Sequence, residues 1–267
     1  MLSTDHKVLT LPQVIATPHL GASTIEAQES VAVDVSNDII KFFTTGTVTN
    51  PVNMPSIPKE KLAEVEPFFA LTEKLGKFLI QVTEGAVKEL NISYAGEVAN
   101  YDVRPLTANA IKGLLSTNHG THVNDVNARY LAERIGMKIN EHKTTTARGF
   151  TNLVTVEVKT DKETHSVAGT LLNGLGARIV KVEGFVVDVI PDGNFLYINN
   201  QDKPGSSVRV ATKLAESQIN IATMQVGRDE IGGSAVMMLG IDNKVTPEDL
   251  VLVGQLENID EVKSIQL

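Results

Sequence analysis

Three prolines fall within eight residues of this chain, at Pro51, Pro55 and Pro58. Because proline has no backbone N–H and a fixed φ, such a run neither continues a helix nor occupies a central strand. It predicts a break near residue 55. A second turn-forming stretch, residues 190–194, lies between two runs rich in β-branched residues and is either a linker or a hairpin. We therefore expect three segments: 1–54, 55–192 and 193–267.

Composition excludes several classes of protein. The 267 residues contain no cysteine, which rules out disulfides and thiolate metal sites and is typical of a cytoplasmic protein. A formal net charge of -8 makes an extended nucleic-acid interface an unexpected role. No apolar stretch reaches the roughly 20 residues that cross a bilayer, and residues 1–7 do not resemble a signal peptide. A length of this size predicts about two domains.

The first segment is predicted to contain one strand and one helix. Residues 13–16 read as a short β-run, and Ser23 and Glu26 have the spacing of a capping box. A helix is expected over residues 25–43, with Val31, Val35 and Ile39 on one face. One strand and one helix cannot form a two-layer core, so the segment should belong to something larger.

The second segment is predicted to mix helices and strands. It opens with a helix whose apolar residues recur with helical spacing: Phe68, Leu71, Leu75, Phe78 and Val82. Strands are expected over residues 91–98, 154–158, 166–172, 179–182 and 185–189, and helices over residues 108–115 and 123–135. An α+β domain fits this order best.

The third segment has the clearest pattern. Strands are predicted over residues 195–201, 219–226, 235–241 and 262–267, and helices over residues 206–217 and 247–256. The first helix is predicted to be amphipathic, with Val208, Ala211 and Ala215 spaced for one apolar face. The order β-α-β-β-α-β is that of a ferredoxin-like fold.

These residues carry a resemblance to a known family. The motif Thr17-Pro18-His19-Leu20-Gly21-Ala22-Ser23-Thr24 is similar to the end of the nucleotide-binding domain in the D-3-phosphoglycerate dehydrogenase family, and Asn50-Pro51-Val52-Asn53 resembles its crossover. The second segment resembles the intervening, allosteric substrate-binding domain of the long form through Tyr94-Ala95-Gly96-Glu97, Ile111-Lys112-Gly113-Leu114-Leu115 and Ala168-Gly169-Thr170-Leu171. The third resembles an ACT domain through Asp202-Lys203-Pro204-Gly205 and Ile219-Asn220-Ile221-Ala222.

The resemblance implies the C-terminal part of an enzyme that oxidises 3-phosphoglycerate with NAD, preceded by a strand-helix remnant of a Rossmann-type domain. No cofactor-binding residue is expected, because Gly174-Leu175-Gly176 lacks the third glycine of a dinucleotide-binding turn. His19 is the implied catalytic residue, since hydride transfer to a keto group needs a proton donor near neutral pKa. A solvated turn histidine is the alternative. The isolated chain is expected to be inactive.

An effector site is implied at the third segment. In ACT domains of this family L-serine binds between paired domains, at positions matching Asn200, Asp202, Gly205 and Asn220. A helix that starts behind Pro204-Gly205 presents free N–H groups to a carboxylate. Ordinary turn chemistry is the alternative explanation of the same residues. Pairing through the edges of the sheets, giving a homo-oligomer, is expected.

Two weaker candidates remain. Arg178 matches a basic position that binds an anionic effector in some relatives, and an exposed edge-strand arginine is the alternative. His119 and His122 lie near Asp125, but zinc sites need three or four ligands, so a polar loop is expected and no metal.

Two functions stay open. The first is the regulatory part of D-3-phosphoglycerate dehydrogenase, controlled by L-serine. The second is a free-standing amino-acid sensor without catalysis. The apolar face predicted in the first segment disfavours the second, because it would leave Val31 and Ile39 exposed to water.

Overall fold

The computed structural model describes residues 7–45, 59–119 and 122–267 and divides into two compact units, residues 1–52 and 53–267. Each unit is described by itself. The break predicted near residue 55 and the motif at residues 50–53 lie outside the described residues.

The first unit contains a 3-10 turn, η1 (Lys7–Thr10), and one long helix, α1 (Ile25–Thr45). The predicted helix is confirmed, but Thr24 rather than Ser23 caps it, with its Oγ1 accepting from Ala27 N at 3.2 Å. The predicted strand at residues 13–16 is wrong. Ile15 is 93% exposed, and the described residues of this unit form no strand. None of the described residues of α1 is buried.

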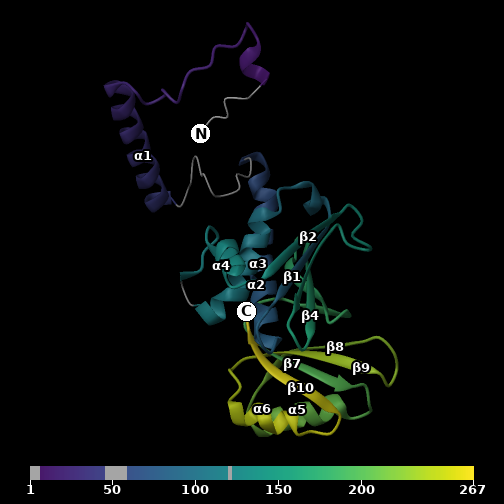
Figure 1. Ribbon diagram of the computed structural model, residues 1–267. Coiled ribbons are helices and arrows are strands. Elements are labelled where there is room, and N and C mark those ends of the chain that lie inside the picture. Colours follow the sequence, from purple (N-terminus) through teal and green to yellow (C-terminus); the bar gives the residue numbers. More distant parts are fainter. Residues whose placement is uncertain (1–6, 46–58, 120–121) are drawn as a thin grey trace. The chain divides into compact units, whose positions relative to one another are not determined.

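The second unit begins with a six-stranded sheet of order β2-β1-β3-β4-β5-β6 (Figure 1). Its strands are β1 (Glu89–Gly96), β2 (Lys138–Thr144), β3 (Asn152–Lys159), β4 (Thr164–Leu172), β5 (Gly176–Val182) and β6 (Phe185–Val189). Only β1 and β2 pair in parallel. The accompanying helices are α2 (Lys59–Val82), α3 (Arg104–His119), α4 (Ala128–Arg134) and the short η2 (Glu97–Asn100). The predicted α+β class is confirmed.

Helix α2 is central to this unit. Its predicted face is confirmed, since Phe68, Leu71, Leu75, Phe78 and Val82 are all buried. Helix α3 crosses α2 at two glycines: a Cβ on Gly76 would lie 2.1 Å from the Ala110 carbonyl oxygen, and one on Gly113 would lie 2.0 Å from the Glu73 carbonyl oxygen. The backbones therefore touch where only glycine fits.

The chain ends in a four-stranded sheet of order β10-β7-β9-β8, built from β7 (Asn194–Gln201), β8 (Ile221–Arg228), β9 (Ser234–Ile241) and β10 (Ile259–Gln266). Helices α5 (Ser206–Glu216) and α6 (Pro247–Gly254) complete the predicted ferredoxin-like order, which is confirmed. The predicted face of α5 is wrong: Val208 is 68% exposed, and Val210 and Leu214 are buried instead. These two larger side chains bury more apolar surface than the alanines on the predicted face.

Both faces of this second sheet are covered. On one face Leu196 and Ile198 pack with α5 and α6. On the other, Phe195 and Tyr197 join the core of the six-stranded sheet, and the rings of Phe78 and Tyr197 meet edge to face at 6.2 Å between centroids. Residues 190–194 connect strands of two different sheets, so this stretch is a linker and not a hairpin. One continuous core joins the two parts of the unit.

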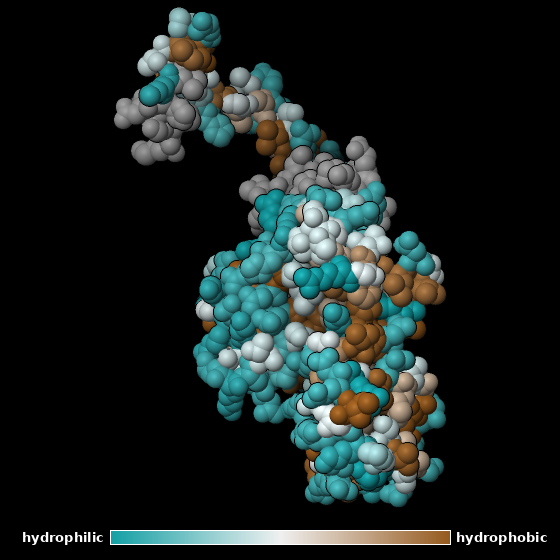
Figure 2. Space-filling model, turned by 90° about the vertical axis from the view of Figure 1, so that its right-hand side faces the viewer, coloured by the Kyte–Doolittle hydropathy of each residue, from teal (hydrophilic) through white to brown (hydrophobic). Residues whose placement is uncertain are grey.

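Among the described residues, no helix is both long and apolar enough to span a bilayer. Large hydrophobic side chains are nevertheless exposed on the four-stranded part, among them Val208, Val226, Ile231 and Val251. Figure 2 shows hydrophobic patches among hydrophilic ones at the level of this sheet and its helices. Such patches are typical of contact surfaces.

Candidate functional site

The end of β7 and the turn that leads from it into α5 hold three of the four predicted effector residues, Asn200, Asp202 and Gly205. Gly205 is the N-cap of α5 and has φ 87°, a left-handed conformation that favours glycine. No side chain caps the helix at this end. The first turn of α5 contains no acidic residue. The helix therefore starts with its positive dipole end uncompensated by an anionic side chain.

Asn200 lies at the end of β7 and is only 2% exposed. Its Nδ2 donates to the Gln201 carbonyl oxygen at 2.8 Å, and the hydroxyl of Ser206, the first residue of α5, donates to the same oxygen at 3.3 Å. This shared acceptor places the Asn200 carboxamide beside the start of the helix. Its Oδ1 is buried and has no hydrogen-bond partner among the described residues.

Asp202 is already engaged within the chain. Arg228 Nη1 donates to its Oδ2 at 2.5 Å, and the Gly232 N–H donates to the same oxygen at 3.2 Å. The Arg228 guanidinium, followed by the Gly232 amide, holds the pKa of Asp202 below its ordinary value. The carboxylate thus fastens the start of the turn to the β8–β9 hairpin and stays ionised.

Asn220 is not brought to this turn. Asn200 pairs with Ala235 at the start of β9, whereas Ile221, next to Asn220, pairs with Ile241 at its end. Six residues of extended strand separate the two positions, or roughly 20 Å. Asn220 Nδ2 instead donates to Asp242 Oδ2 at 2.7 Å. The four predicted residues form one site only if a second copy of the chain supplies Asn220.

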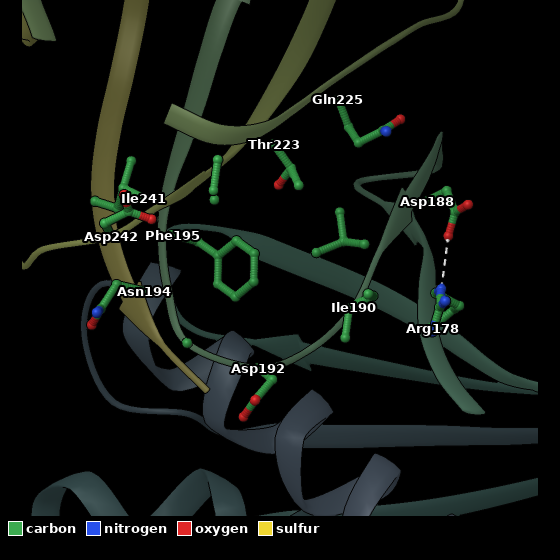
Figure 3. Close-up of a pocket in the computed structure, with 14 residues that line it drawn as sticks. Arg178, Asp188, Ile190, Asp192, Asn194, Phe195, Thr223, Gln225, Ile241 and Asp242 are labelled. Carbon is green, nitrogen blue, oxygen red and sulfur yellow. Dashed lines mark ion pairs between the residues drawn. The ribbon is translucent and has the colours of Figure 1, made fainter. Parts of the chain in front are cut away.

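Arg178 lines a cavity of about 460 Å³ between the two sheets. Asp188 lies on β6, Thr223 and Gln225 on β8, and Phe195 on β7, and all four face this space (Figure 3). Asp242, the partner of Asn220, lines it as well. The cavity therefore touches both a predicted anion-binding residue and the support of a predicted effector residue.

The arginine is not at a sheet edge, so the edge-strand alternative is wrong: β5 lies between β4 and β6, and the Arg178 side chain is 13% exposed. Its Nε lies 3.3 Å from Asp188 Oδ1, and its Nη1 donates to the carbonyl oxygens of Leu175 and Ala177 at 2.7 and 2.9 Å. Three of its contacts are thus intramolecular, and the predicted anion site remains a prediction.

His19 lies in a bend of the first unit and is exposed. Gly174-Leu175-Gly176, the closest match to a dinucleotide turn, connects the antiparallel strands β4 and β5 and precedes no helix. This turn therefore does not fit NAD, because the phosphates of the cofactor bind where a strand and a turn lead into the start of a helix. No catalytic step through a nicotinamide follows from these residues.

Two further histidine regions bear on metal binding. His122 is exposed and its carbonyl oxygen accepts from Asn127 Nδ2 at 2.8 Å; the side chain of His119 lies outside the described residues. In the parts of the chain that the structure describes, no three His, Asp or Glu side chains are grouped to hold a metal ion. The structure also reveals a buried histidine that sequence reasoning missed, His165, whose Nδ1 lies 3.0 Å from Glu183 Oε1.

Comparisons with known proteins match both parts of the second unit. The model of the D-3-phosphoglycerate dehydrogenase intervening domain matches residues 64–183, and the ACT domain model matches residues 195–258. The chain is 37% identical over 263 residues to a D-3-phosphoglycerate dehydrogenase of Bacillus subtilis and 37% identical over 263 residues to one of Methanocaldococcus jannaschii. Each match covers 98% of this chain and 50% of the relative.

A third relative, from Archaeoglobus fulgidus, is 33% identical over 267 residues, which is 99% of this chain and 50% of that protein. The chain thus spans about half the length of the curated relatives that it matches. The first matched range contains strands of the six-stranded sheet, and the second contains strands of the four-stranded sheet. The chain therefore combines an intervening domain of the D-3-phosphoglycerate dehydrogenase type with an ACT domain.

Proposed function

We propose that this chain is the regulatory, C-terminal portion of an NAD-dependent D-3-phosphoglycerate dehydrogenase. The whole enzyme oxidises 3-phosphoglycerate to 3-phosphohydroxypyruvate, the first step of L-serine synthesis, and L-serine acts as its effector at the ACT domain. In the complete cytoplasmic enzyme His19 accepts the hydroxyl proton during oxidation of 3-phosphoglycerate and donates it in the reverse reduction. The chain by itself is inactive, because its closest match to a dinucleotide-binding turn, Gly174-Leu175-Gly176, joins two antiparallel strands.

The core shared by the two domains is the observation that supports regulation most strongly. Tyr197 of the ACT sheet packs on Phe78 of α2, and β7 carries Tyr197 and Asn200 on the same strand. A ligand that orders the end of β7 therefore acts on a strand that is packed against the intervening domain. Coupling additionally requires that L-serine bind one domain arrangement more tightly than another, because a ligand that binds both equally well does not change their populations.

The effector site proposed here is shared between two copies of the chain. Asn200 and Gly205 come from one copy and Asn220 from the other, because a single chain holds them at opposite ends of β9. Exposed hydrophobic residues on the ACT part, such as Val226 on the edge strand β8, support pairing of this kind.

Calorimetric titrations of the chain with L-serine and with NADH test this function. We expect saturable L-serine binding, at one site per chain of a dimer, and no binding of NADH. Failure to bind L-serine would contradict the effector assignment, and NADH binding would contradict the regulatory-portion assignment.

The alternative is a free-standing amino-acid sensor. The feature that disfavours this alternative is the apolar face of α1. Its residues Val31, Val35 and Ile39 are 49%, 51% and 52% exposed. Such a face is typical of a helix that packs against further protein. The coding sequence upstream of Met1 separates the two: a dinucleotide-binding domain there supports the dehydrogenase, and a stop codon directly upstream supports the sensor.

A further inference from the structure

We propose that Arg209 binds the carboxylate of an α-amino acid at the start of α5, with Asn200 Oδ1 accepting from its ammonium group. This inference rests on the proposed effector function and extends it with a residue that no sequence pattern singled out. It assigns the two charged ends of the ligand to two groups of the same chain.

Arg209 lies across the N-terminus of its own helix. A Cβ built on Gly205 would approach Arg209 Nη1 to 2.9 Å and Cζ to 3.7 Å. The guanidinium therefore occupies the position where an N-cap side chain usually stands. Any larger residue at 205 would meet both the strain of φ 87° and this guanidinium.

The side-chain charge at the N-terminus of α5 is the positive charge of Arg209, which is unusual at this end of a helix. The N-terminus of a helix attracts anions and disfavours cations, and α5 offers neither an acidic residue in its first turn nor a capping side chain. A guanidinium at this position is thus unfavourable unless an anion joins it. A bound carboxylate would accept both from Arg209 and from the free N–H groups of the first turn.

The hydrogen bonds of Arg209 are incomplete. Its Nη2 reaches the Glu257 carbonyl oxygen at 3.5 Å, a long contact, and its Nε is buried with no partner among the described residues. A buried donor without a partner is costly and rare in native proteins. The fork of Nε and Nη groups matches a carboxylate in two-point geometry.

An independent observation points to the same ligand. Asn200 is 2% exposed, its Oδ1 has no partner among the described residues, and its carboxamide lies beside Ser206 at the helix start. A buried acceptor and a buried donor, both unsatisfied, thus flank one helix N-terminus. A zwitterion supplies what each lacks, an ammonium for Asn200 and a carboxylate for Arg209.

Asp202 does not compete for the ammonium in this arrangement, because Arg228 and Gly232 already bond its carboxylate. Its role in the inference is to hold the turn in place. This division leaves Asn200 Oδ1 as the acceptor for the ammonium group.

The test is calorimetric titration of the chain with L-serine, backed by a thermal-shift screen of the other common L-amino acids. The variants are Arg209→Gln, Arg209→Lys and the control Lys213→Gln. Lys213 lies on the same helix, pairs with Glu216 at 2.9 Å and is remote from the turn, so its substitution removes the same charge elsewhere. Circular dichroism checks that each variant folds.

We expect Arg209→Gln to weaken amino-acid binding by about 10- to 100-fold, the usual effect of losing a charge-assisted hydrogen bond. Arg209→Lys should keep part of the affinity, because it retains the charge and loses the fork. Lys213→Gln should change affinity by less than about 3-fold. Ethanolamine, which lacks the carboxylate, should bind the wild-type chain no better than it binds Arg209→Gln.

The outcomes separate the two claims. If L-serine binds and Arg209→Gln behaves like Lys213→Gln, the role of Arg209 is wrong and the effector function stands. If another amino acid binds in an Arg209-dependent way and L-serine does not, the serine assignment is wrong and the role of Arg209 stands. If no amino acid binds, both are wrong.

Discussion

The side-chain amide of Gln81 bonds the backbone of Gln266 in both directions. Gln81 Nε2 donates to the Gln266 carbonyl oxygen at 3.1 Å, and its Oε1 accepts from the Gln266 N–H at 2.9 Å. One residue of α2 in the intervening domain thus continues the hydrogen-bond pattern of β10 in the ACT domain. Nearby, Lys263 Nζ lies 2.6 Å from Glu84 Oε1 and makes a second link.

Replacing Gln81 with alanine tests this link. The N–H and the carbonyl oxygen of Gln266 would lose their side-chain partner and bond to water instead. We therefore expect the free energy of unfolding to fall by about 1 to 2 kcal/mol. Urea denaturation monitored by circular dichroism measures it. Gln255→Ala, at an exposed position after α6, is the control and should change stability by less than about 0.5 kcal/mol. Equal effects of the two substitutions would contradict the proposed link.

The glycine crossing of α2 and α3 gives a larger effect. A methyl group on Gly113 would overlap the Glu73 carbonyl oxygen, so Gly113→Ala must push the helices apart, and we expect a loss of about 3 kcal/mol or more. Gly254→Ala is the matched control, since a Cβ there meets nothing within 4 Å. It should be neutral or stabilise the chain by about 0.4 to 1 kcal/mol. Thermal unfolding of both variants measures the difference, and a tolerated Gly113→Ala would show that the helices do not touch there.

His165 predicts a dependence of stability on pH. The Glu183 carboxylate, which lies 3.0 Å from its Nδ1, raises the pKa of His165 above the ordinary 6.5, and burial works in the opposite direction. Glu163 Oε1 lies 3.3 Å from His165 Nε2 but without hydrogen-bond geometry. It therefore contributes less than Glu183 to raising the pKa of His165. Because the folded pKa is raised, the stabilisation is complete below about pH 6.5 and is lost as pH rises through the folded pKa.

The measurement is urea denaturation of the wild-type chain and of His165→Gln between pH 6 and 9. We expect the difference in stability between them to shrink as pH rises, and the imidazole resonances to titrate above pH 6.5. A difference that stays constant over this range would show that folding does not raise the pKa of His165.

The elements that could be predicted from the sequence are those whose residue pattern is set by burial alone. The five apolar residues of α2 repeat with helical spacing and all face the core. Strand β2 was missed because Lys138–Thr144 is a polar edge strand without apolar alternation. The face of α5 was misassigned because both sides of the helix carry small apolar residues, and only packing against β7 and β9 decides between Val208 and Val210.

The candidate site was predictable only in part. The turn residues Asn200, Asp202 and Gly205 are near neighbours along the chain, so motif reasoning placed them together correctly. The distance of Asn220 depends on the antiparallel register of β8 and β9, which no local pattern reveals. Arg209 was overlooked because a basic residue on a helix surface is ordinary in a sequence; its significance appears only from its position over Gly205.

Hydrogen–deuterium exchange of the chain with and without saturating L-serine tests the central claim, that an effector at the ACT turn acts on the intervening domain. We predict slower exchange at two places, the start of α5 and the junction of α2 with β10 around Gln81 and Gln266. Protection at the first place alone would contradict coupling between the domains, and unchanged exchange at both would contradict the effector site itself.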